Sequence, residues 1–152
     1  MLRQENGFLR SGAWNALTAC RLGGRRMLKV LIVDDNASFR GSFRDLLSQQ
    51  LPQVVILEAA DGKEALEQMR RTAPDLAFID IELPGENGLD LTRQLRGRHV
   101  DMPIAIITNY DLPEYRLAAR DCGADSFFSN TFSSAEDIFA WIEFASRGVS
   151  VP

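Results

Sequence analysis

Three short apolar runs in this chain each end at an acidic or hydroxyl-bearing residue. They are Val30–Val33 before Asp34 and Asp35, Leu76–Ile79 before Asp80, and Ile104–Ile107 before Thr108. Short bounded runs of Val, Ile and Leu are typical of strands buried in a parallel sheet. The carboxyl ends of parallel strands lie along one edge, where an open α/β sheet binds its ligand. The sequence therefore predicts that these side chains, although far apart in the chain, meet in one site.

The charges divide the chain into a basic leader and an acidic body. Residues 1–26 hold five Arg and one Glu, whereas the rest of the 152-residue chain holds 12 basic and 20 acidic residues. We interpret 1–26 as a flexible leader, either a docking arm or an extension left by an upstream start or by cloning. Residues 27–148 are expected to form one domain, large enough to bury a core. Residues 149–152 are expected to be a tail or the start of a linker.

The same properties exclude several classes of protein. An acidic body argues against direct binding of nucleic acid, which needs clustered Lys and Arg. No apolar stretch approaches the roughly 18–20 residues of a membrane span, and the leader lacks a secretory apolar region. Cys20 and Cys122 give no disulfide framework, which favours a reduced, cytoplasmic location.

The body alternates strand-like and helix-like patterns five times. The expected strands are 28–33, 54–58, 76–80, 103–108 and 125–129, and the expected helices are 37–51, 61–72, 89–97, 112–122 and 134–147. Five β–α units with short connections predict a doubly wound parallel sheet with helices on both faces. A strand order of 2-1-3-4-5 suits this length. Its switch point lies between the first and third strands, where Asp34, Asp35 and Asp80 lie.

Three carboxylates in one place restrict the chemistry of the site. At about 4–6 Å, each like-charged pair costs on the order of 4 kcal/mol at an effective dielectric constant near 20. Either one carboxyl group takes up a proton or a divalent cation neutralises the cluster, and Mg²⁺ suits such oxygen ligands. An aspartate can also act as a nucleophile and form an aspartyl-phosphate. The sequence thus predicts a Mg²⁺-assisted phosphoryl acceptor at Asp80; the alternative for Asp34 and Asp35 is that they only cap the next helix.

Several segments together resemble the receiver domain of two-component response regulators. They are Val30–Asn36 for the first strand and acidic pair, Phe78–Gly88 for the phosphoacceptor strand and loop, Ile106–Thr108 for the switch hydroxyl, and the recurrent segments Ala59–Gly62 and Gly123–Asp125. The resemblance covers roughly 28–147. It implies a flavodoxin-like (βα)5 fold and a bacterial signalling function.

The resemblance also implies a role for each site residue. Asp80 would accept the phosphoryl group from the phosphohistidine of a sensor histidine kinase or phosphotransfer protein. Asp35 would bind Mg²⁺ directly, Asp34 would assist through water, and the backbone carbonyl of Glu82 would complete the metal shell. Thr108 would follow the phosphoryl group.

One position departs from the family pattern. The family has a Lys at the end of the fifth strand, where by spacing Asn130 stands, followed by Thr131 in place of a frequent Pro. An amide offers only neutral donors, with weaker hydrogen bonds than an ammonium group. The metal site and nucleophile remain, so the departure bears mainly on the coupling from phosphate to the output surface. Asn109, beside the switch hydroxyl, is expected to narrow the access to Asp80.

The expected output face is formed by helix 112–122, strand 125–129 and helix 134–147. Phe127 would fill the family's aromatic switch position on this face, which would bind a downstream protein or a second copy of the chain. In the last helix, Ile138, Ile142 and Ala145 share one side and Phe144 lies opposite, with Trp141 and Phe132 flanking it. These aromatic residues are interpreted either as partly buried or as a partner surface.

Three functions follow. The first is a receiver that is not an enzyme, although it takes part in its own Mg²⁺-dependent phosphorylation and dephosphorylation. The second is a receiver fold that acts as a phosphorylation-independent interaction module. The third is an aspartyl-phosphate hydrolase, suggested by Asp80 and Glu82 but disfavoured because such enzymes need a second Asp at the latter position. His99, in an exposed-loop composition, is not expected to donate phosphate or bind metal.

Overall fold

The computed structural model describes residues 27–98, 101–130 and 133–147. Its strands are β1 (Lys29–Val33), β2 (Val55–Ala59), β3 (Leu76–Ile79), β4 (Ile104–Thr108) and β5 (Ser126–Ser129). Its helices are α3 (Ala37–Gln50), α4 (Gly62–Thr72), α5 (Gly88–Arg98), α6 (Pro113–Asp121) and α7 (Ala135–Arg147). The strands form one parallel sheet in the order β2-β1-β3-β4-β5, which confirms the predicted fold class and strand order.

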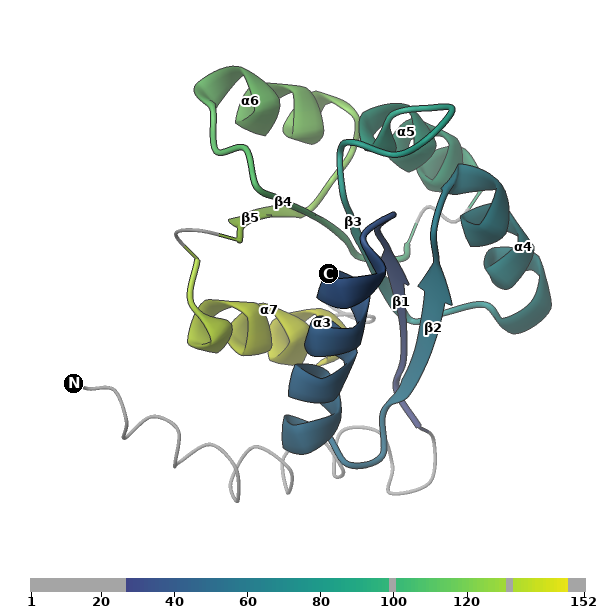
Figure 1. Ribbon diagram of the computed structural model, residues 1–152, viewed down its shortest axis with the longest axis vertical. Coiled ribbons are helices and arrows are strands. Elements are labelled where there is room, and N and C mark those ends of the chain that lie inside the picture. Colours follow the sequence, from purple (N-terminus) through teal and green to yellow (C-terminus); the bar gives the residue numbers. More distant parts are fainter. Residues whose placement is uncertain (1–26, 99–100, 131–132, 148–152) are drawn as a thin grey trace.

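The sheet separates two hydrophobic cores (Figure 1). Helices α4, α5 and α6 cover one face and enclose the first core with it. Helices α3 and α7 cover the other face and enclose the second core. The side chains of β1 alternate between them: Leu31 and Val33 enter the first core, whereas Val30 and Ile32 enter the second. All four are fully buried, which explains why the strand appears in the sequence as a continuous apolar run.

Helix α3 is capped by Asn36, whose side chain accepts a hydrogen bond from the N–H of Phe39 at 3.0 Å. The alternative that Asp34 and Asp35 serve only as a helix cap is therefore wrong. Asn36 is the preferred type of residue for this position because its short side-chain oxygen satisfies an N–H group that the helix leaves unpaired. Both carboxylates of the acidic pair stay free of that role.

The last helix buries the side that the pattern predicted. Ile138, Ile142 and Ala145 are buried, whereas Phe144 is 55% exposed. Trp141 packs edge-on against Phe78, with 5.4 Å between the ring centroids. Trp141 is therefore partly buried against the core, in agreement with the first of the two interpretations.

Several predictions fall on parts of the chain that the structure does not describe. They concern the leader with Cys20, the tail, His99, Thr131 and Phe132. Cys122 is buried and has a free thiol. None of the helices in the described ranges is long and apolar enough to cross a membrane.

Candidate functional site

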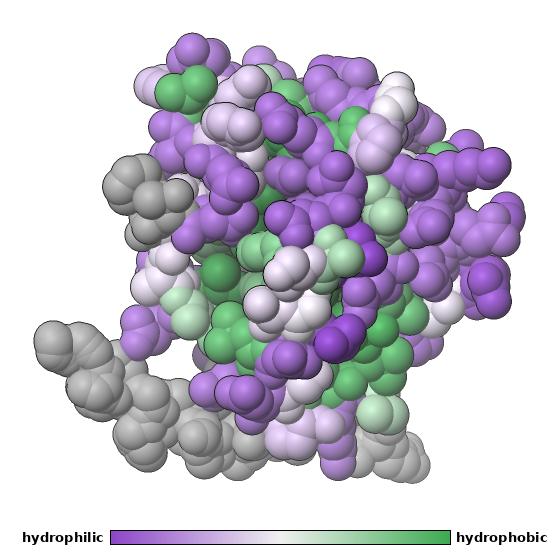
Figure 2. All heavy atoms as spheres, in the orientation of Figure 1, coloured by the Kyte–Doolittle hydropathy of each residue, from purple (hydrophilic) through white to green (hydrophobic). Residues whose placement is uncertain are grey.

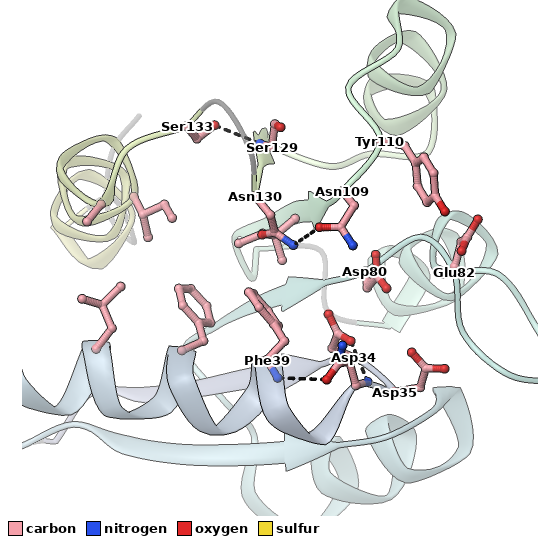
Figure 3. Close-up of a pocket in the computed structure, with 16 residues that line it drawn as sticks. Asp34, Asp35, Phe39, Asp80, Glu82, Asn109, Tyr110, Ser129, Asn130 and Ser133 are labelled. Carbon is pink, nitrogen blue, oxygen red and sulfur yellow. Dashed lines mark hydrogen bonds between the residues drawn. The ribbon is translucent and has the colours of Figure 1, made fainter.

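The three acidic residues meet at the carboxyl edge of the sheet, as the sequence predicted. Strands β1 and β3 are neighbours, and Val33 pairs with Ile79, so the residues that follow each strand lie side by side. One carboxylate oxygen each from Asp34, Asp35 and Asp80 lies within 4.8 Å of the others (Figure 3). Such a cluster of oxygen ligands is of the kind that holds a divalent cation.

Asp80 is held by hydrogen bonds in a partly buried position. The N–H of Ile81 donates to its Oδ1 at 2.8 Å, and the N–H of Glu82 and the hydroxyl of Thr108 also donate to the carboxylate. These donors favour the charged form. Burial and the neighbouring charge of Asp34 outweigh them and raise the pKa of Asp80 to about 7. The carboxyl group is thus poised between its two protonation states near neutral pH.

Asp34 is the deepest member of the cluster, with 4% of its surface exposed. Its Oδ1 accepts the N–H of Asn36 at 2.8 Å. Burial raises the pKa of Asp34, and the charge of Asp35 adds to the rise, whereas the charge of Arg40 opposes it.

Arg40 supplies a cation beside the acidic pair that the sequence pattern did not predict. Arg40 donates from Nη1 to the backbone carbonyl of Asp34 at 2.6 Å and from Nε to Glu58 at 3.0 Å. Arg44 holds the other oxygen of Glu58 at 2.9 Å. This network ties α3 to β2 and to the end of β1, so Arg40 fixes the backbone that carries the acidic pair. Its place four residues after Asn36, in the first turn of the helix that follows the acidic pair, was the available signal.

Gly88 allows the loop after β3 to close against Asp80. A Cβ atom at Gly88 would lie 1.8 Å from the backbone oxygen of Asp80, and the N–H of Gly88 donates to the carbonyl of Ile81 at 2.6 Å. Real Cβ atoms do not make contacts that short, so only glycine fits. The side chain of Asn87 then accepts the N–H groups of Leu89 and Asp90 at the start of α5. The loop that follows Asp80 is thus pinned at both ends.

The opposite side of the site is formed by the ends of β4 and β5. Thr108 is fully buried and pairs with Ser129, which places Asn109 beside Asn130. Asn130 Nδ2 donates to Asn109 Oδ1 at 3.0 Å (Figure 3). Asn130 therefore occupies the place expected from its spacing, with its amide turned to the site. The pairing of these two amides could not be predicted from the sequence, because the residues are 21 positions apart.

A cavity of about 490 Å³ connects the acidic cluster with an apolar cleft between α3 and α7. The apolar end is lined by Phe39, Phe43, Leu46, Ile107 and Ile138. Figure 2 shows hydrophobic side chains in this hollow, whereas the surface over α4 and α5 is mostly hydrophilic. Among the described residues that line the cavity, the charged ones are all acidic: Asp34, Asp35, Asp80 and Glu82. Sequence periodicity could not predict the cleft, because it depends on the spacing of two helices.

Phe127 lies on β5 with its ring half-buried against the first core. The guanidinium carbon of Arg116 stands 4.7 Å from the ring centroid, and Arg116 also donates to Asp111 at 2.6 Å. Its hydrogen bond with Arg116 lowers the pKa of Asp111. The aromatic residue predicted at a switch position is therefore covered by a cation that α6 supplies.

Residues 30–143 match the model of the response regulator receiver domain, and the chain belongs to this family. It is 38% identical over 109 residues to the response regulator MprA of Mycobacterium leprae, a match that covers 72% of this chain and 47% of that protein. The MprA of Mycobacterium tuberculosis is 37% identical over the same length, with 46% of its chain covered. The chain thus spans about half the length of the curated relatives it matches. Membership of the family implies a histidine kinase or another phosphodonor as a partner.

Solved structures show the same fold. A CheY-like receiver domain protein from Methanospirillum hungatei JF-1 superposes with a TM-score of 0.74 at 22% identity, covering 82% of this chain and 97% of that one. A LuxR-family response regulator from Aurantimonas sp. SI85-9A1 superposes with a TM-score of 0.73 at 29% identity, covering 81% and 87%.

Proposed function

We propose that this receiver domain accepts a phosphoryl group on Asp80 from the phosphohistidine of a sensor kinase or phosphotransfer protein. The observation that carries the proposal is the convergence of three carboxylates within 4.8 Å at the end of β3, with the Thr108 hydroxyl on the same carboxylate. An oxygen of Asp80 would form the new bond to phosphorus as the phosphorus–nitrogen bond of the donor breaks. The imidazole leaves with the electron pair, and Asp80 gives up no further proton once it is ionised.

The cluster fits Mg²⁺ as the cofactor. The three side chains offer only carboxylate oxygens as ligands. Because Asp35 is exposed and Asp80 is half-buried, there is room for the water ligands that Mg²⁺ keeps. Asp34, Asp35 and Asp80 would hold the ion together with the backbone carbonyl of Glu82, which also lines the cavity. When bound, Mg²⁺ would neutralise the cluster, keep Asp80 ionised and stabilise charge on the phosphoryl oxygens.

The other residues have supporting roles in this proposal. The Thr108 hydroxyl would shift its hydrogen bond from the Asp80 carboxylate to a phosphoryl oxygen. This shift would couple the modification to β4. The backbone N–H groups of Ile81 and Glu82 would keep the carboxylate oriented throughout. Arg40 would hold the acidic pair in place by its bond to the carbonyl of Asp34.

The output would be a protein contact in the cytoplasm, without catalysis on an external substrate. The large apolar residues exposed along α6, α7 and the loop before α6 are Tyr110, Leu112, Leu117 and Phe144. Exposed apolar groups favour a protein partner or a second copy of the chain over nucleic acid, which the acidic body would repel. We place the downstream contact on the face formed by α6, β5 and α7.

A second candidate is an interaction module that does not depend on phosphorylation. The observation that favours it is the neutral amide of Asn130 at the place where the family has a cation. This candidate predicts a constant affinity for the partner whatever the state of Asp80.

Mass spectrometry of the intact protein distinguishes the two candidates. The chain is incubated with acetyl phosphate and Mg²⁺, with Asp80→Asn as the control. A phosphoryl adduct on the wild type that the variant lacks supports the receiver function. If neither acetyl phosphate nor a panel of phosphorylated kinases yields an adduct, the proposal is wrong and the interaction module remains.

A further inference from the structure

Asn109 and Asn130 form an amide pair at the mouth of the site. They follow β4 and β5 directly, both are exposed, and both line the cavity that contains Asp80. The single hydrogen bond between them runs from Asn130 Nδ2 to Asn109 Oδ1. In Figure 3 the amide group of Asn109 lies between Asn130 and Asp80, with its nitrogen on the side of Asp80.

This hydrogen bond leaves a donor unused. It occupies the carbonyl oxygen of Asn109, so both hydrogens on Asn109 Nδ2 stay available. That nitrogen has no hydrogen-bond acceptor among the residues that the structure describes. The bond also fixes which end of the Asn109 amide faces Asn130, and therefore which end faces the acid.

The electrostatics of the cavity make this donor important. The charged side chains that line it in the described part of the chain are four acids, with no Lys or Arg among them. A phosphoryl group on Asp80 would add negative charge to this environment. From the β4–β5 side, the donors that it would meet are neutral: the Thr108 hydroxyl and the two amides.

We propose that Asn109 donates a hydrogen bond from Nδ2 to an oxygen of the phosphoryl group on Asp80, and that Asn130 is the positioning residue that orients the Asn109 amide. This inference rests on the proposed phosphorylation of Asp80. In the transfer, the bond from Asp80 to phosphorus forms as the bond from phosphorus to the leaving group breaks. The leaving group takes the electron pair, and Asn109 moves no proton.

The inference predicts unequal effects at the two positions. A hydrogen bond to a charged acceptor is stronger than one between neutral groups, and its loss weakens binding by roughly tenfold. Loss of Asn130 only frees the Asn109 amide to rotate, so we expect about a threefold effect. Because Asn130 acts through Asn109, its removal is expected to have no further effect once Asn109 is absent.

Beryllium trifluoride serves as the probe, because it binds to an aspartate in the place of a phosphoryl group. Its affinity for the full chain is measured by calorimetry at fixed Mg²⁺ for the wild type, Asn109→Ala, Asn130→Ala and the double variant. We expect affinities reduced about tenfold, threefold and tenfold, respectively. The Mg²⁺ affinity without beryllium trifluoride and the melting temperature are expected to stay at the wild-type values.

Three further variants sharpen the test. Asn109→Asp keeps the size of the side chain but repels the bound anion, so it is expected to weaken binding more than Asn109→Ala. Asn130→Lys, introduced into the Asn109→Ala background, reaches the anion directly and is expected to restore at least the wild-type affinity. Gln94→Ala removes an amide that bonds Glu86 outside the cavity and is expected to change nothing.

Three results would overturn the inference. The first is wild-type affinity in Asn109→Ala. The second is an Asn130→Ala effect as large in the Asn109→Ala background as in the wild type. The third is a parallel loss of Mg²⁺ affinity or melting temperature, which would make the pair merely structural. Failure of the proposed function is a separate result, in which the wild-type chain itself takes up neither beryllium trifluoride nor a phosphoryl group.

Discussion

The two sides of the site are held in different ways. On the β1–β3 side, Asp34 and Asp80 are fixed by burial, backbone N–H groups and a loop pinned at Gly88. On the β4–β5 side, two exposed amides are held to each other by one side-chain hydrogen bond. Among the described residues that line the cavity, the charged ones all lie on the first side. In the proposed function, acceptance of the phosphoryl group would therefore depend on the rigid β1–β3 side. Hydrogen bonds to that group from the β4–β5 side would come from the buried Thr108 hydroxyl and the two exposed amides.

The largest effect is expected at Gly88, which lies against the backbone of Asp80. Gly88→Ala places a Cβ atom against the carbonyl of Asp80, so the loop or the strand end must move. We expect a loss of about 3 kcal/mol in the free energy of unfolding, measured by urea denaturation. Gly97→Ala in the same helix is the matched control, because nothing lies within 4 Å of the added atom. Stability equal to that of the wild type in Gly88→Ala would show that the loop is not pinned.

The strands could be predicted to within one residue, and the reason is visible in the cores. Buried parallel strands show no alternation of polar and apolar residues, so β1 and β3 stand out as bounded apolar runs. The acid cluster followed from the strand order alone. The amide pair could not be predicted, because it depends on the register that sets Thr108 against Ser129. The bond from Arg40 to the carbonyl of Asp34 depends likewise on a side-chain conformation that no pattern encodes.

Removal of one charge from the acidic side is expected to have the next largest effect. Asp35→Asn leaves the hydrogen-bonded members of the cluster in place but lowers its charge. We expect the affinity for Mg²⁺ to fall roughly 30-fold, a value between the limits of Coulomb's law in water and at a protein surface. Asp45→Asn, an exposed acid on α3 outside the cavity, controls for net charge. Equal effects of the two variants in a calorimetric titration would place the ion elsewhere.

Burial of Asp80 also predicts how stability depends on pH. Because the pKa of Asp80 rises from 3.8 to about 7 on folding, the folded domain holds a proton that the unfolded chain has lost. The stabilisation is present at acidic pH and is lost as the pH rises through about 7. The raised pKa of Asp34 acts in the same direction.

Partial exposure of the group reduces the size of this effect. Fully expressed, the shift would amount to about 4 kcal/mol, and solvent screening leaves about 1–2 kcal/mol. Without metal, the wild type is expected to lose this much stability relative to Asp80→Asn between pH 4 and pH 8. Denaturation curves of both proteins at each pH measure the difference. A difference that stays constant or grows in the opposite direction would contradict the assigned burial of Asp80.

The smallest effect is expected from restoring charge to the amide side. In Asn130→Lys, a cation faces Asp80 across the cavity and is expected to lower its pKa by about one unit. Carboxyl NMR titration without metal measures the shift, and Asn130→Gln is the neutral control of similar length. An unchanged pKa in Asn130→Lys would mean that the end of β5 does not face the acid.

The most direct test of the central claim is to locate the phosphoryl group chemically. The chain is phosphorylated with acetyl phosphate in Mg²⁺, reduced with borohydride, which converts an aspartyl-phosphate to homoserine, and sequenced by peptide mass spectrometry. Our account predicts homoserine at position 80 only, and none when Mg²⁺ is chelated. Homoserine at another position, or equal labelling without Mg²⁺, would contradict it.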